Sequence, residues 1–132
     1  MTTQLTAPEI AQDWLDSWNH HDLDAIMSHY AEDVELTSPF VAQITGDPAG
    51  TVTGKAALRT YFAKGLATYP DLRFELLQIF TGVNSFVLYY RSSISTLAAE
   101  LMVLNSQGQV VKVVAHYCPD PVVLLQPKRS AT

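Results

Sequence analysis

Glu100 is the residue of this chain with the strongest case for doing chemistry. It lies in the otherwise largely apolar run TLAAELMVL. Burying a lone carboxylate is costly, so we expect this group to be paired, protonated or close to solvent in a pocket. In a pocket, desolvation raises the pKa of a carboxyl group towards neutrality, which suits a general acid or base. The alternative is a structural ion pair with an arginine such as Arg91 or Arg59.

The four histidines offer less chemistry. His20 and His21 are neighbours beside acidic residues, but their side chains point in different directions, and no further ligand has a metal-binding spacing. We therefore predict no metal site, with both residues solvated in a turn and His29 on the surface of a short helix. His116 depends on the register of the last two strands. We expect it to face away from Glu100, whereas a slip of one residue would make the two an acid–base pair.

Nucleophilic catalysis and phosphate binding find no support in the sequence. Ser38 and Cys118 have no partner at the spacing of a catalytic triad, and no G-x-S-x-G motif is present. The segment around Gly46 and Gly50 lacks a phosphate-binding pattern. Because Cys118 is the single cysteine, it cannot form an internal disulfide, and one thiol fits a reducing cytoplasm.

Three helices are predicted in the first half of the chain. The first, over residues 8–18, begins at a Thr6 cap with Glu9 three positions later, and it carries Trp14 and Trp18 on its buried stripe. The pattern that follows predicts, in order, a short helix at 23–30, a strand at 34–38 ended by a proline, a loop or loose hairpin at 40–53, and a helix at 55–68.

The second half reads as strands separated by turn residues. They are expected at 73–80, 86–93, 96–104 and 109–117, with an extended piece at 122–125. Three helices followed by antiparallel strands predict an α+β domain over residues 1–125, with a disordered tail at 126–132. Several strands are apolar on both faces, so we expect the convex face of the sheet to meet a second subunit in a homodimer.

Composition excludes several classes of partner. The 132 residues include 13 acidic and 8 basic side chains, for a net charge of −5, which argues against binding nucleic acid or an anionic membrane. The first residues show no signal peptide, and no apolar run is long enough to span a bilayer. We therefore expect a cytoplasmic protein.

An ordered series of short motifs runs through residues 6–118. They are WLDSWNHHDLDAI, YAEDVE and SP in the first 39 residues, then GKAALRTYF, PD and NSQGQV. In this order and spacing they resemble the nuclear transport factor 2-like superfamily, and within it the SnoaL-like and ketosteroid isomerase-like groups. The resemblance implies a cone-shaped, strongly curved, mainly antiparallel sheet wrapped around three helices, with an apolar pocket at one end. This fold hosts isomerases, cyclases, dehydratases, hydrolases and non-catalytic domains, so it does not specify a reaction.

The resemblance also allows the residues of one specific reaction, steroid isomerisation, to be compared with this sequence. In ketosteroid isomerase an aspartate is the base, while a tyrosine and a protonated aspartic acid bind the oxyanion. The resemblance places Trp14 at the tyrosine, Ser38 at the base and Glu100 at the oxyanion acid. An indole cannot give up a proton as a phenol does, and a serine hydroxyl is no general base without an activating partner. Steroid isomerase chemistry is therefore not expected.

Together these observations predict a pocket for a small apolar or aromatic organic ligand. We expect a cofactor-free isomerase, cyclase or dehydratase in which Glu100 is the acid–base residue. The predicted ligand-binding residues are Trp14, Tyr30, Ser38, Phe40, Phe62, Ala98, Met102, Ala115 and Tyr117. The alternative is a non-catalytic ligand-binding or dimeric scaffold domain of the same fold. The two altered catalytic positions favour this alternative, and a pocket filled by Trp14 and Phe62 would support it.

Overall fold

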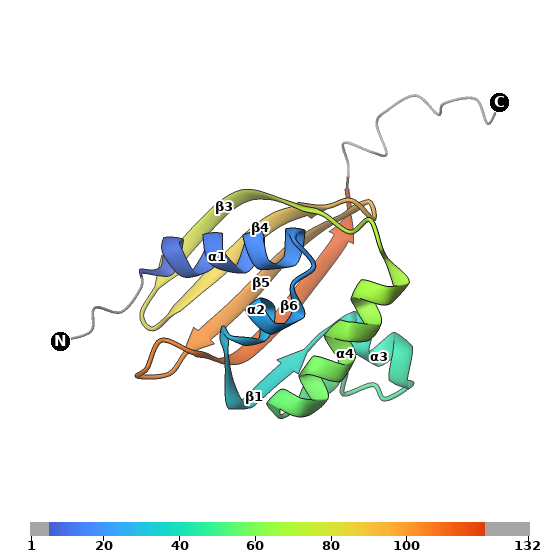
Figure 1. Cartoon of the computed structure of the whole chain (residues 1–132), viewed down its shortest axis with the longest axis horizontal. Coiled ribbons are helices and arrows are strands. Elements are labelled where there is room, and N and C mark those ends of the chain that lie inside the picture. The colour runs from blue at the N-terminus through green and yellow to red at the C-terminus, as the bar shows by residue number, and fades with distance from the viewer. Residues whose placement is uncertain (1–5, 121–132) are drawn as a thin grey trace.

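The computed structural model describes residues 6–120. The elements are α1 (Ala7–Asn19), α2 (Leu23–Met27), β1 (Tyr30–Thr37), α3 (Pro39–Thr45), β2 (Thr51–Thr53), α4 (Lys55–Thr68), β3 (Phe74–Gly82), β4 (Ser85–Ser92), β5 (Thr96–Leu104) and β6 (Val110–Pro119). The strands form one curved sheet in the order β2-β1-β6-β5-β4-β3 (Figure 1). Strands β1 and β6 are parallel and every other pair is antiparallel. The predicted α+β class is confirmed.

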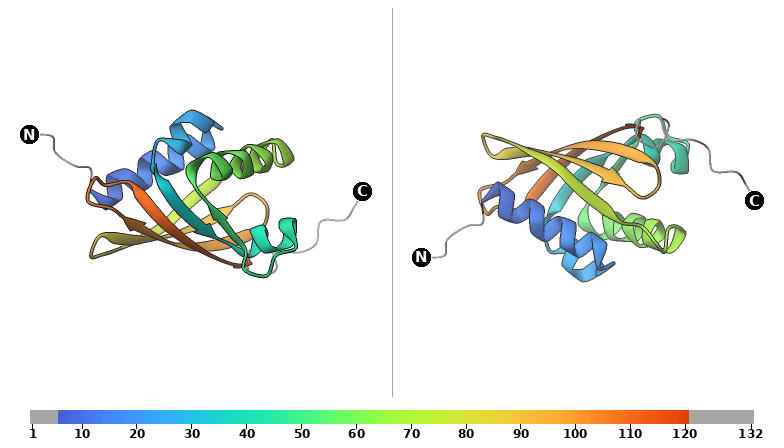
Figure 2. Two further views of the ribbon diagram at one scale, coloured as in Figure 1. Left: turned by 90° about the horizontal axis from the view of Figure 1, so that it is seen from below. Right: turned by 90° about the horizontal axis from the view of Figure 1, so that it is seen from above.

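The helices cover one face of this sheet. Helix α1 packs against β3 and β4, and α4 packs against β1 and β2, while α3 lies at one end of the sheet (Figure 2). Helix α1 begins as predicted, because the Thr6 side chain and Glu9 form a reciprocal capping box. Its buried stripe includes Trp14 and Trp18, which pack on the concave face of the sheet.

The segment predicted as a loop at 40–53 is instead a helix and a short strand. Ser38 caps α3 by accepting a hydrogen bond from the Phe40 N–H at 3.2 Å, and Pro39 occupies the first turn. Gly46 ends the helix with a φ of 77°. The proline does end β1, as predicted, but a serine followed by proline also starts a helix. Strand β2 then returns to pair with β1.

The short helix predicted at 23–30 ends at Met27, and β1 begins earlier than predicted, at Tyr30. Tyr30 pairs with Val110 of β6, and the register shifts between Tyr30 and Glu35. This irregularity breaks the alternation of apolar and polar residues that marks a strand, so sequence periodicity detected only its second half.

The hairpin of β5 and β6 has the expected register. Glu100 lies opposite Ala115, and His116 lies opposite Ala99 on the other face of the sheet. His116 is exposed, so the acid–base pair that a one-residue slip would have formed does not exist. The extended piece predicted at 122–125 and the tail predicted at 126–132 lie outside the described residues.

The outward face of the sheet is also partly apolar. Along β4, the inward residues are buried, and the outward Val87 and Tyr89 are half-buried. At the β3–β4 edge, Phe80 and Val83 are exposed. No helix in the described range is long and apolar enough to cross a membrane.

Candidate functional site

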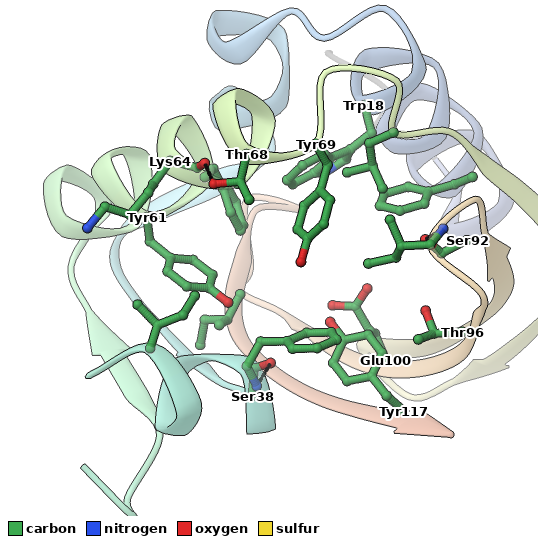
Figure 3. Close-up of a pocket in the computed structure, with 18 of the residues that line it drawn as sticks. Trp18, Ser38, Tyr61, Lys64, Thr68, Tyr69, Ser92, Thr96, Glu100 and Tyr117 are labelled. Atoms are coloured by element: carbon green, nitrogen blue, oxygen red, sulfur yellow. Dashed lines mark hydrogen bonds between the residues drawn. The ribbon is translucent and has the colours of Figure 1, made fainter. Parts of the chain in front are cut away.

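A cavity of about 350 Å³ opens between the concave face of the sheet and helices α1, α3 and α4 (Figure 3). The buried part of its wall is aromatic, and Trp14 stacks on Phe74 with ring centroids 5.6 Å apart. Trp18 meets Phe62 edge-on at 4.8 Å. The exposed rim carries Tyr69, which follows α4, and residues of α3 and α4. A buried aromatic wall with polar groups placed among its rings is typical of a site for a small organic ligand.

Glu100 is the carboxyl group of this cavity. Glu100 is only 5% exposed, and its side chain points into the cavity (Figure 3). Burial raises the pKa of Glu100 to about 7, and the hydrogen bond from Tyr90 partly opposes this rise. Near neutral pH the group therefore populates both its acid and its base form.

The alternative of a structural ion pair at Glu100 is wrong. Arg91 binds Asp120 at 2.6 Å and Glu75 at 3.0 Å. Arg59 binds Asp24 at 2.5 Å. The partner of Glu100 is the phenol of Tyr90, which donates to Oε2.

Four tyrosines of the cavity wall interact electrostatically with this carboxyl group. Burial raises the pKa of Tyr30, Tyr61, Tyr90 and Tyr117, and the negative charge of Glu100 raises each of them further. All four phenols therefore stay neutral at physiological pH and keep their protons. A neutral phenol is a hydrogen-bond donor, so the cavity offers donors around a single titrating carboxyl group.

Two further polar contacts organise the wall. Trp14 Nε1 donates to the Tyr30 hydroxyl at 2.8 Å, and both side chains are buried. Ser38 is also buried, and its backbone N–H donates to the Gly50 carbonyl at 2.9 Å. A Cβ atom at Gly50 would lie only 2.9 Å from the Ser38 carbonyl oxygen. No carboxylate or imidazole within residues 6–120 hydrogen-bonds to the Ser38 side chain, so its hydroxyl has no group that would activate it as a base.

The structure places most of the predicted site residues in the cavity wall. These are Trp14, Tyr30, Ser38, Phe40, Phe62, Glu100 and Tyr117. Their roles towards a ligand stay predictions.

Three predicted residues, Ala98, Met102 and Ala115, share the concave face but do not form part of the wall. Ala98 lies between Tyr90 and Tyr117 on the neighbouring strands, and these two larger side chains line the cavity while Ala98 does not. Met102 lies between Phe86 and Val113, deeper in the core.

Several wall residues were not predicted. Tyr90 is diagonal to Glu100 across the β4–β5 pair, because Leu88 lies directly opposite Glu100. The alternation of β4 could have identified it. Tyr61 and Tyr69 lie on and just after α4, and Figure 3 shows both hydroxyls pointing into the cavity.

The remaining histidines differ in part from expectation. His20 is exposed, as predicted for a turn. His21 is half-buried, and its Nε2 lies 2.7 Å from the Leu72 carbonyl, so it joins the end of α1 to the segment before β3. His29 is half-buried and follows α2. Within residues 6–120, no three His, Cys, Asp or Glu side chains gather in a way that could hold a metal ion.

The curved sheet, the helices on its concave face and the cavity at one end define the nuclear transport factor 2-like fold. The chain belongs to the SnoaL-like domain family, whose model matches residues 11–118. A SnoaL-like protein of unknown function from Burkholderia thailandensis is 41% identical, with a TM-score of 0.82 over 89% of this chain and 99% of the other.

More distant structures share the fold alone. An NTF2-like protein of unknown function from Cytophaga hutchinsonii is 17% identical, with a TM-score of 0.70 over 93% of this chain and 99% of the other. A third structure is that of SalBIII, an epoxide hydrolase/cyclase-like enzyme with a role in pyran ring formation in the polyether salinomycin. It is 18% identical, with a TM-score of 0.68 over 84% of this chain and 89% of the other. Among curated proteins, no sequence matches the chain.

Proposed function

We propose that this protein is a cofactor-free acid–base enzyme of the isomerase, cyclase or dehydratase kind. Its substrate is a small apolar or aromatic organic molecule, and Glu100 transfers the proton. The observation that carries this proposal is a buried carboxyl group with a pKa of about 7 that opens into an aromatic cavity. A buried carboxyl group whose pKa is raised towards neutrality in a cavity is a candidate general acid or base.

The site supports both halves of a proton transfer. Ionised Glu100 accepts a proton from the substrate, and Tyr90 stabilises the ionised form through its hydrogen bond. The protonated carboxyl then returns the proton to a different atom of the same molecule. An isomerisation or cyclisation of this kind needs no co-reactant, because the electron pair of the broken bond to hydrogen stays in the substrate. In a dehydration the protonated carboxyl instead gives its proton to the departing hydroxyl group, which leaves as water. The low dielectric of the cavity strengthens each of these interactions.

The exchange Glu100→Gln tests this proposal. The glutamine keeps the size of the side chain but cannot take up a proton at neutral pH. Exchange of the C–H hydrogens beside the carbonyl of a two-ring ketone such as 2-tetralone, followed by NMR in D₂O, reports proton transfer even where the natural substrate is unknown. We expect wild-type protein to accelerate exchange and Glu100→Gln to lose the acceleration by about 10²-fold or more.

A matched control is Glu35→Gln, because Glu35 is exposed on β1 and lies outside the cavity wall. Equal exchange in wild type and Glu100→Gln would refute the assignment of Glu100, as would the absence of exchange by wild type across a panel of enolisable cyclic ketones.

The second candidate function is ligand binding without turnover. The altered residues at Trp14 and Ser38 favour it, and saturable ketone binding without accelerated exchange would support it. The cavity stays open with Trp14 and Phe62 in its wall, so a filled scaffold is the weaker form of this alternative.

We propose further that two copies associate through the convex face of the sheet. The half-buried apolar side chains that support this proposal are Val87, Tyr89, Ala99, Leu101 and Val103.

A further inference from the structure

The hydrogen bond between Trp14 and Tyr30 has only one possible direction. An indole N–H donates and accepts nothing, so the phenol oxygen of Tyr30 must be the acceptor at 2.8 Å. A phenol that accepts through its oxygen still has its own proton to donate. Trp14 therefore orients the Tyr30 hydroxyl without using its proton.

Within residues 6–120, the groups that interact with the Tyr30 hydroxyl oxygen are the indole N–H groups of Trp14 and Trp18, and both are donors, so the phenol proton meets no protein acceptor. The residue is 1% exposed, yet it forms part of the cavity wall. Buried polar groups are almost always hydrogen-bonded, and a buried donor without an acceptor is destabilising. The hydroxyl proton of Tyr30 therefore points towards the cavity.

We propose that Tyr30 donates a hydrogen bond to an oxygen atom of the bound substrate, that Trp14 is the residue that positions it, and that the site thereby selects ligands with a carbonyl or hydroxyl oxygen at the buried aromatic end. This inference rests on the ligand site of the proposed function but not on proton transfer by Glu100.

The other phenols of the wall are less suited to this task, and one of them, Tyr69, is exposed at the rim rather than buried at the aromatic end. The proton of Tyr90 is committed to Glu100. Tyr61 and Tyr117 interact with the Ser38 hydroxyl and are less buried than Tyr30. Burial also raises the pKa of Tyr30, although the indole N–H groups of Trp14 and Trp18 partly oppose the rise. Its phenol therefore remains protonated over the whole physiological range.

With Tyr30 as the donor, an indole at position 14 is compatible with a substrate-binding site. The family resemblance places a phenol donor at this point of the first helix. Here the indole N–H of Trp14 is bonded to the phenol of Tyr30, at the start of β1. The donor has moved from the helix to the strand, and it still belongs to the same aromatic end of the cavity.

Two ligands of matched shape test the proposal: 2-acetylnaphthalene with a ¹³C-labelled carbonyl, and 2-ethylnaphthalene, which has no oxygen. Binding is measured at pH 9, above the pKa of Glu100, so that its carboxyl cannot be the donor. We expect Tyr30→Phe to weaken ketone binding about tenfold and to change hydrocarbon binding less than about twofold. The ¹³C resonance of the bound carbonyl should move towards its position in an apolar solvent.

The control Tyr89→Phe removes a phenol from the outward face of β4, and it should leave both affinities and the resonance unchanged. In Trp14→Phe the ¹³C resonance of the bound carbonyl should lie between its positions in wild type and in Tyr30→Phe, because the phenol of Tyr30 is present but no longer oriented. If Tyr30→Phe does not fold, Tyr30→3-fluorotyrosine keeps the shape of the ring and strengthens the donor, and the resonance should move in the opposite direction.

An unmoved carbonyl resonance in these variants overturns the proposal. Equal weakening of ketone and hydrocarbon also overturns it, because that result would assign Tyr30 a structural role. Failure of wild-type protein to bind the ketone has the same consequence. Loss of exchange activity in Glu100→Gln is a separate readout, so the two proposals succeed or fail independently.

Discussion

Tyr90 and Glu100 lie diagonally across neighbouring strands, and the phenol of Tyr90 donates its hydrogen bond to Glu100 Oε2 inside the cavity. Burial raises the pKa of the carboxyl, and this hydrogen bond lowers it, leaving a value of about 7. The pair thus holds a buried acid near neutrality without a cationic partner among the described residues.

The stability of the fold should decrease as pH rises through this range. The folded carboxyl keeps its proton up to about pH 7, whereas the unfolded chain loses it near the ordinary value of 4.5. Between these values the native state binds more protons, so the free energy of unfolding falls with rising pH, by about 3 kcal/mol in total. Urea unfolding at pH 5 and pH 8 measures this change.

Glu100→Gln provides the comparison for that experiment, because it has no titrating group at this position. Its free energy of unfolding should lack this decrease, and at pH 8 it should exceed the wild-type value. Identical pH profiles in the two proteins would show that Glu100 does not titrate in this range.

Removal of the Tyr90 hydroxyl should raise the pKa of Glu100 further. In Tyr90→Phe the ionised carboxyl loses its hydrogen-bond donor while its burial is unchanged, so the neutral form is favoured. We expect the pKa of Glu100 to rise by about one in Tyr90→Phe, and the pH dependence of base catalysis should move to higher pH by the same amount. The side-chain ¹³C resonance of Glu100 reports the shift, and a fall in its pKa would show that Tyr90 acts in the opposite sense.

Asn19 should be important for both stability and ligand binding. Its side chain donates to the Phe74 carbonyl at 3.0 Å and accepts from the Phe74 N–H at 2.7 Å, which joins the end of α1 to the start of β3. Asn19→Ala should cost about 2 kcal/mol in urea unfolding, because two partly buried backbone groups lose their partners. Ligand affinity should also fall, since Phe74 lines the cavity.

The control for this change is Gln12→Ala on the exposed face of α1, where the side chain bonds, within residues 6–120, only to Asp16. It should cost less than about 0.5 kcal/mol. Equal effects of the two substitutions would argue against the structural role of Asn19.

The homodimer proposal predicts that a charge on the convex face gives a monomer. Leu101 lies between Val87 and Val114 on this face, so Leu101→Lys would bring two ammonium groups into an apolar contact between subunits. Light scattering should give twice 14.6 kDa for wild type and 14.6 kDa for Leu101→Lys. Gln12→Lys, on the helical side of the sheet, should stay dimeric, and a monomeric wild type would contradict the proposal.

Sequence reasoning predicted Glu100 and the register of the last hairpin because a lone carboxylate in an apolar strand and a clear turn are local signals. It failed at Pro39, where one residue both ends a strand and starts a helix. It assigned Ala98 to the pocket and omitted Tyr90, although both lie on the inward face. Which of two inward residues reaches the cavity depends on the relative size of cross-strand neighbours, and this becomes known only once the pairing is known.

The most direct measurement of the central claim is an NMR titration of the ¹³C-labelled side-chain carboxyl of Glu100 in wild-type protein. We predict a midpoint of about 7, shifted upwards in Tyr90→Phe. A midpoint near the ordinary value of 4.5 would show a solvated carboxylate and would contradict its role as the acid–base residue of this cavity.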